Sequence, residues 1–191
     1  MSGFEMGAAA ERRLAARRPL ALDARAPVAI KRNLHEADIG ADADAFARAF
    51  TATLSEPRAF GPIRIKRARG RVGQPFALGE RFLGAVDLGL PAWLAERFTS
   101  DFAEIIELTP RRARYRYLDG CPMAGVSSFE ITPAGDGRCR FSALFEYQEL
   151  GGLGISVLSR FGLRLHDRVV AEQVAAAARS IGADILWTTF A

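Results

Sequence analysis

Lysine and histidine are scarce in this chain of 191 residues, which has only two of each. Lys31 and Lys66 are the lysines, so arginine carries nearly all of the positive charge. Lys+Arg 26 against Asp+Glu 22 gives a formal net charge of +4. A dedicated nucleic-acid binder usually has a one-sided basic excess. The mixed charge therefore predicts no nucleic-acid partner.

Cysteine is equally sparse, and the motifs of metal and nucleophile chemistry are missing. Cys121 and Cys139 are the two cysteines, and the chain has no CxxC, HExxH or GxSxG pattern. These absences exclude a zinc framework and a disulfide scaffold and leave Ser and Cys nucleophiles unsupported. The glycines Gly152 and Gly154 are followed by Val157 where a dinucleotide loop needs its third glycine. We expect neither a metal nor another cofactor.

Long apolar runs are also absent. No run approaches the roughly 20 residues that span a bilayer, and the first twenty residues lack the apolar segment of a secretory signal. We therefore expect a cytoplasmic protein without a membrane span. Residues 1–25 are rich in Ala and Arg and show no apolar stripe, which predicts a basic tail or a loosely attached short helix. Residues 26–191 are long enough for a single domain.

The first elements of that domain follow from spacing. Residues 27–34 alternate apolar and polar side chains and predict a strand that buries Val28, Ile30 and Leu34, with His35 on its polar face. Asp42 and Asp44 then precede Phe46, Phe50 and Leu54, which are four residues apart. This arrangement predicts a capped helix with one buried stripe.

The middle of the chain has the pattern of hairpins. Short alternating stretches separated by Gly, Pro and Asp predict six antiparallel strands. They are placed near 62–69, 79–88, 101–108, 111–118, 125–132 and 138–147. The stretch 91–98 is expected to be a loop or a short helix. The fold class is therefore α+β.

Alternation gives the sheet an aromatic face and an Arg-rich face. Arg112, Arg114, Arg116, Arg138 and Arg140 are expected on the solvated face. The aromatic face is either plain core or the wall of a ligand pocket. Its residues are Phe82, Tyr115, Tyr117, Phe129, Phe141, Phe145 and Tyr147.

Residues 155–181 predict the longest helix. Its apolar arc contains two polar residues near the middle, His166 and Gln173, so both are expected to face the sheet. Buried groups of this kind need partners, since each unpaired one costs on the order of 1–3 kcal/mol. The partners are either tyrosine hydroxyls and strand backbone, or water and ligand in a cavity. In a cavity, His166 is a hydrogen-bond handle or a general acid/base.

This order of elements resembles the helix-grip fold of the START, polyketide-cyclase and Bet v 1-like superfamily. The resemblance covers about residues 27 to 181, and GVSSFEITPAGDGRCRFSALFEY with the following helix carries most of it. It implies a curved antiparallel sheet of about seven strands wrapped around a long C-terminal helix. Four segments depart from the pattern, and any of them can fill or cap a cavity. They are the loop GRVGQPFALG, the stretch PAWLAERF between strands, the N-terminal residues 1–25 and the apolar C-terminal DILWTTFA.

The resemblance also implies a function. In this superfamily an elongated, largely apolar cavity between sheet and helix binds lipids, polyketides or other hydrophobic molecules, and ligand pockets start at about 300 Å³. We therefore expect a hydrophobic small-molecule ligand on the aromatic face, with His166 and Gln173. The alternatives are a cyclase/dehydratase-like enzyme in which His166 moves a proton, and a partner-binding protein whose core is filled. The sequence leaves undecided whether the protein forms a homodimer.

Overall fold

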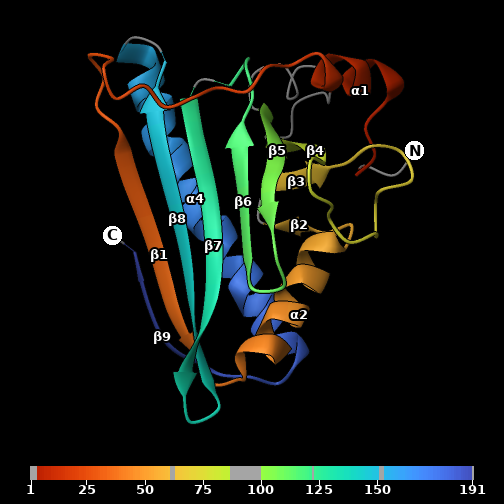
Figure 1. Ribbon diagram of the computed structural model, residues 1–191, viewed down its shortest axis with the longest axis vertical. Coiled ribbons are helices and arrows are strands. Elements are labelled where there is room, and N and C mark those ends of the chain that lie inside the picture. Colours follow the sequence, from red (N-terminus) through yellow and green to blue (C-terminus); the bar gives the residue numbers. More distant parts are fainter. Residues whose placement is uncertain (1–3, 61–62, 87–99, 122, 151–152, 191) are drawn as a thin grey trace.

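One curved antiparallel sheet dominates the structure, a computed structural model that describes residues 4–60, 63–86, 100–121, 123–150 and 153–190. The described strands follow the order β2-β3-β4-β5-β6-β7-β8-β1-β9 across the sheet (Figure 1). The strands are β1 (Lys31–Ile39), β2 (Ala59–Phe60), β3 (Ile63–Lys66), β4 (Arg81–Val86), β5 (Ser100–Leu108), β6 (Arg112–Tyr117), β7 (Met123–Gly135), β8 (Arg138–Glu149) and β9 (Ile185–Phe190). The helices in these residues are α1 (Ala8–Ala15), α2 (Ala43–Ser55) and α4 (Leu153–Ser180).

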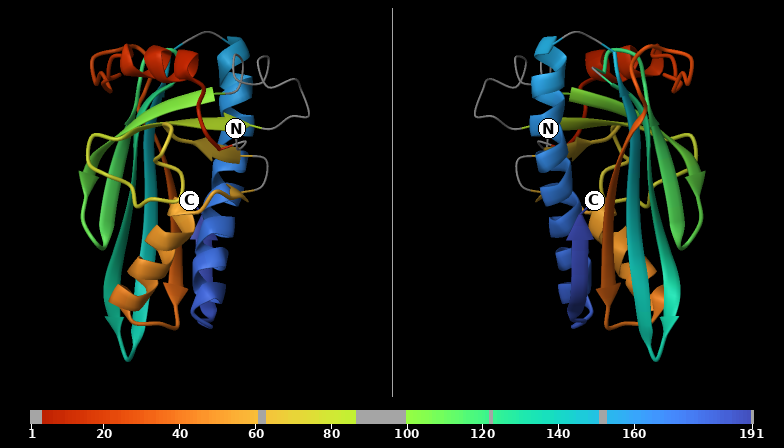
Figure 2. Two further views of the ribbon diagram at one scale, coloured as in Figure 1. Left: turned by 90° about the vertical axis from the view of Figure 1, so that its right-hand side faces the viewer. Right: turned by 90° about the vertical axis from the view of Figure 1, so that its left-hand side faces the viewer.

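Helix α4 runs along the concave side of the sheet, and α2 lies between the two at one end (Figures 1 and 2). The α+β class and the helix-grip arrangement are confirmed. The six expected hairpin strands are present as β3 to β8. The sheet has nine described strands rather than about seven, because β2 and β9 extend it at its two edges. The stretch 91–98 lies outside the described residues.

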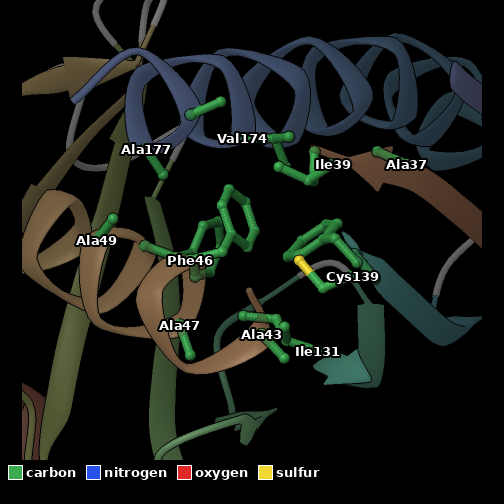
Figure 3. Close-up of a cluster of buried hydrophobic side chains, with 14 of the residues drawn as sticks. Ala37, Ile39, Ala43, Phe46, Ala47, Ala49, Ile131, Cys139, Val174 and Ala177 are labelled. Atoms are coloured by element: carbon green, nitrogen blue, oxygen red, sulfur yellow. The ribbon is translucent and has the colours of Figure 1, made fainter. Parts of the chain in front are cut away.

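Helix α2 begins where the sequence indicates. The Asp42 side chain accepts hydrogen bonds from the backbone N–H groups of Asp44 at 2.9 Å and Ala45 at 3.2 Å, which satisfies free amides at the helix start. Phe46 and Phe50 are buried. They belong to a cluster shared by α2, α4, β1, β7 and β8, which Figure 3 shows. This cluster fills one end of the concave side.

The expected phase of the first strand is wrong. Strand β1 begins at Lys31, and Val28 and Ile30 lie before it with more than a third of their surface exposed. Within the strand His35 and Ile39 are buried. The reason is long-range, since the register with β8 pairs Ile39 with the buried Cys139 and thereby turns the odd-numbered residues inward.

The N-terminal segment packs on the sheet rather than hanging free of it. Met6 and Leu14 are buried with Leu83 and Leu118, so the expectation that residues 1–25 lack buried apolar side chains is wrong. Leu83 alternates along β4 with Phe82, which faces α4, so α1 covers the opposite face of that strand. Periodicity alone misses this packing because one leucine and one methionine suffice to form it.

The C-terminal segment adds the edge strand β9, which pairs antiparallel with β1. The expected arginines of the outer face form ion pairs with acidic neighbours. Arg116 lies 2.9 Å from Glu104, and Arg140 lies 2.8 Å from Asp38. Among the described residues, no helix combines the length and the apolar character that a membrane crossing requires.

Candidate functional site

The concave side is hollow beside the packed cluster, whose Phe50 and Phe141 line one cavity, and at the end away from it. Two cavities lie between the sheet and α4, one of about 90 Å³ and one of about 140 Å³. Ile65, Phe82, Tyr115 and Gln173 line both, so the cavities adjoin. Neither reaches the size of about 300 Å³ at which ligand pockets usually start. The site is smaller than expected because phenylalanines of α2 and of the loop before β4 occupy part of the space.

The two cavities differ in the side chains that line them, since one borders the phenylalanines of α2 and the other contains the ionisable residues Asp101 and His166, and we name them accordingly. The apolar chamber is the cavity of about 90 Å³, which Phe50 and Leu54 of α2, Phe76 of the loop and Phe129 of β7 help to line. The polar chamber is the cavity of about 140 Å³. Its polar side chains are Asp101, Tyr115, Tyr117, His166 and Gln173. A molecule that spans both chambers meets the phenylalanines of the apolar chamber at one end and the ionisable groups Asp101 and His166 at the other.

Most of the expected site residues lie in these walls. The aromatic residues around the chambers are Phe82, Tyr115, Tyr117, Phe129, Phe141 and Phe145, and α4 contributes His166 and Gln173. Tyr147 lines neither chamber. Its ring stacks on Phe145 at a centroid distance of 4.9 Å and lies below the Lys31 amino group at 5.9 Å. It supports the wall from behind.

His166 faces the sheet, as its position in the helix predicts. Its ring stacks on Phe145 with centroids 5.2 Å apart, and its side chain is 18% exposed. Neither ring nitrogen has a hydrogen-bond partner within the described residues. The Nδ1 atom lies 3.9 Å from Asp167 Oδ1, which is too long for a hydrogen bond. The bonds to tyrosine hydroxyls or strand backbone that would make it an ordinary core histidine do not form there.

Asp101 is the residue that sequence reasoning missed. It lies on β5 and lines the polar chamber together with Ala103. Burial raises the pKa of Asp101 to about 6, and the charge of His166 acts in the opposite direction. Its carboxylate has no hydrogen bond to another described residue. The alternation of the strand could have predicted this position, because Asp101 lies on the same inward face of β5 as Ala103 and Ile105.

Gly84 makes room beside this carboxylate. The register pairs Gly84 with Asp101, and a side chain added at Gly84 would meet Asp101 Cβ at 3.8 Å, an ordinary contact distance. Burial also raises the pKa of Tyr115 and raises that of Tyr117 well above its usual range. Both phenols are therefore protonated at neutral pH. The polar chamber offers phenol donors, a carboxyl group and an imidazole to a molecule inside it.

The second histidine lies close to the site. His35 Nε2 is 3.1 Å from Thr188 Oγ1, and the ring packs on Phe190 of β9. Burial lowers the pKa of His35. Burial acts to raise the pKa of Asp167, but His166, Asn33 and the charge of His35 outweigh it, so that pKa is lowered. Asp167 is therefore a stable anion beside both imidazoles.

Neither cysteine behaves as a nucleophile. Both are buried, and burial raises the pKa of Cys121 to about 12 and that of Cys139 to about 11. Their thiols stay protonated at neutral pH. No group of three or more His, Cys, Asp or Glu side chains in the described part of the chain is arranged to hold a metal ion.

Comparison with known proteins finds similarity in three dimensions. No family model and no curated protein matches the sequence. Norcoclaurine synthase from Thalictrum flavum, solved with dopamine and hydroxybenzaldehyde, has a TM-score of 0.57 at 14% identity over 86% of this chain and 96% of its own. The Zhui aromatase/cyclase from a Streptomyces species has a TM-score of 0.58 at 13% identity over 80% and 96%.

A protein of unknown function from Bacillus thuringiensis has a TM-score of 0.51 at 10% identity over 78% of this chain and 98% of its own. At such low identities these likenesses show the fold alone. The chain has the helix-grip fold, which it shares with these structures. What it does has to be argued from its own site.

Proposed function

We propose that this protein binds a small hydrophobic molecule in the two chambers between the sheet and α4. The observation that carries the proposal is the imidazole of His166, which has no hydrogen-bond partner among the described residues and lies in the wall of a cavity lined mainly by aromatic and aliphatic side chains. A buried polar group without a partner costs on the order of 1–3 kcal/mol, and a ligand that bonds to it recovers that cost. A neighbour of the same fold was solved with dopamine and hydroxybenzaldehyde, which supports a small aromatic molecule as the class of ligand.

The size of the chambers restricts the ligand. An engineered cavity of about 150 Å³ binds benzene, and the polar chamber has about 140 Å³. It therefore accommodates about one aromatic ring. The adjoining apolar chamber, at about 90 Å³, takes a short alkyl group. We infer a ligand with one ring, a polar group near His166 and a short apolar chain, rather than a sterol or a long lipid.

Native mass spectrometry of freshly purified protein tests this proposal. We expect an adduct of a small hydrophobic molecule, and we expect Gly84→Val to lose it because the added side chain enters the polar chamber beside Asp101. Gly40→Val is the matched control, since Gly40 lines neither chamber and its added Cβ also stays at 3.6 Å or more from its neighbours. A bare apo mass, together with no binding of 4-ethylphenol by calorimetry, contradicts the proposal.

A second candidate function is a cyclase/dehydratase-like enzyme that uses the same cavity. The observation that favours it is Asp101, whose raised pKa of about 6 suits a general base near neutral pH and whose chamber also contains His166. In this mechanism the Asp101 carboxylate takes a proton from the carbon next to a substrate carbonyl. His166 donates a proton to the carbonyl oxygen, which leaves an enol. The reverse steps return both protons.

Hydrogen–deuterium exchange into 4-methylacetophenone, followed by NMR in D₂O, tests this mechanism. If His166 is the acid, His166→Gln lowers the exchange rate by about 10²–10⁴-fold while 4-ethylphenol binding is retained. If His166 is only a hydrogen-bond handle, His166→Gln weakens binding by about 1–2 kcal/mol. An exchange rate no faster than that of buffer rules out the enzyme and leaves the binding protein.

A further inference from the structure

The loop between β3 and β4 has a defined conformation that backbone hydrogen bonds hold in place. Gly70, Gly73 and Gly79 have φ values of 77°, 78° and 77°, a conformation that side chains rarely adopt. The loop also bonds to β5, since the Gly79 N–H donates to Ile105 O at 2.8 Å and the Ile105 N–H donates to Glu80 O at 2.9 Å. Its position over the sheet is therefore fixed by backbone contacts.

A buried ion pair holds the loop closed. Arg67 and Glu80 are 3% and 7% exposed, and the guanidinium Nε and Nη2 donate to the two carboxylate oxygens at 2.6 and 2.8 Å. Arg67 also donates to the backbone carbonyls of Gln74 and Pro75. Arg71 adds a bond of 2.8 Å to Glu80. Two-pronged pairing of this kind fixes geometry as well as charge.

The Arg67–Glu80 ion pair, which we call the clamp, fixes the position of Phe76. From 73 to 79, Phe76 is the one residue that is not exposed. The Arg67 guanidinium lies 4.0 Å above the centre of its ring on one side, and Phe82 meets it edge to face at 5.6 Å. Phe76 lines the apolar chamber together with Phe50 and Leu54 of α2. The loop thus presents one phenyl ring to the cavity and holds it there.

We infer that Phe76 is the specificity-determining residue of the cavity, a fixed cap that limits the length of the apolar part of the ligand. The inference rests on the proposed function, because it assigns a role to a wall of that binding site. Replacing the ring by a methyl group opens about one ring's worth of space at the end of the apolar chamber. The class of ligand that this cap admits is a para-substituted aromatic with a short alkyl chain.

A series of 4-alkylphenols from methyl to octyl, measured by isothermal titration calorimetry, tests the inference. Each methylene that enters the apolar chamber lowers Kd by about fourfold. In the wild-type protein this gain stops at the chain length that reaches Phe76. In Phe76→Ala the gain continues for about two further methylenes or more before it stops. Phe76→Leu gives a smaller shift and stands in for Phe76→Ala if that variant does not fold.

Leu78→Ala is the matched control, because Leu78 lies in the same loop and is 68% exposed. We call the alkyl chain length at which the affinity stops rising the break point. In Leu78→Ala the break point is expected at the same chain length as in the wild-type protein. If the wild-type protein binds the phenols but the break point stays in place in Phe76→Ala and Phe76→Leu, the assignment of Phe76 is wrong and the binding site stands. If no protein in the set binds any of the phenols, the proposed function itself fails.

Discussion

The two ends of the concave side differ in what occupies the space between the sheet and α4. At one end α2 is inserted, and Phe46, Phe50 and Phe141 are at most 1% exposed in a cluster without polar groups (Figure 3). At the other end α4 faces the strands without α2. There the walls include Asp101 and His166, and the polar chamber remains, while the apolar chamber lies between the two ends. We refer to these as the filled end and the hollow end.

The difference shows how one sheet serves stability and binding together. Apolar burial contributes about 25 cal/mol per Å², and α2 concentrates it where its phenylalanines meet β8. The hollow end gives up part of that contribution, because the imidazole of His166 has no hydrogen-bond partner in the described structure and burial disfavours the charged form of Asp101. Natural proteins tolerate such local costs mainly at functional sites. The hollow end is therefore where function is expected.

The largest contrast is expected from removing one ring at each end. Phe46→Ala leaves a void in the packed cluster and should lower the free energy of unfolding by about 3–5 kcal/mol. Phe82→Ala should cost less than half of that, since Phe82 is partly exposed and already borders both chambers. Urea denaturation measures both. Equal losses would show that the two ends are packed alike.

Removing the charge at the hollow end should stabilise the protein. The folded-state pKa of Asp101 is raised to about 6, above its unfolded value, so the folded form holds the proton longer. Stability therefore falls as pH rises from about 4 to about 6, by up to about 3 kcal/mol. Asp101→Asn should abolish that fall and raise the free energy of unfolding by about 2–3 kcal/mol at pH 7.

The matched control for this variant is Asp38→Asn, because Asp38 is paired with Arg140 on the outer face and its pKa is lowered. The two variants should give opposite changes in the slope of stability against pH. If Asp101→Asn destabilises the protein at pH 7, the carboxylate has a stabilising partner and the account of the hollow end is wrong.

The smallest effects distinguish two glycines on the sheet. A methyl group at Gly125 would lie 2.8 Å from Glu146 O and 3.0 Å from the Phe145 ring, so Gly125→Ala should cost about 1–3 kcal/mol. The corresponding group at Gly84 meets nothing closer than 3.8 Å. Gly84→Ala should therefore leave stability unchanged or raise it by about 0.4–1 kcal/mol while it weakens binding of 4-ethylphenol. If Gly84→Ala lowers the free energy of unfolding, the polar chamber has no free space for the added methyl group.

The sequence predicted the filled end better than the hollow end. Asp42 and the spacing of Phe46 and Phe50 are local signals, and they were sufficient to place α2. His166 was also predicted to face the sheet, because helical phase depends only on spacing. These features depend on local sequence and not on contacts with distant segments.

The remainder depends on contacts between distant segments. The burial of His35 follows from the pairing of β1 with β8, and the pocket position of Phe76 follows from the Arg67–Glu80 clamp. Asp101 was overlooked because an acidic residue at the start of a strand is typical of an exposed turn. Its burial emerges only when α4 covers β5.

An NMR titration of the labelled protein with 4-ethylphenol tests the central claim most directly, because it observes both ends at once. The account predicts saturable amide shifts at Gly84, Ala103 and Ser127, which surround the chambers, and none at Ile39, Ala49 and Ala177 in the filled end. Shifts spread equally over both ends, or confined to the filled end, would contradict it, as would a spectrum that does not change at saturating phenol.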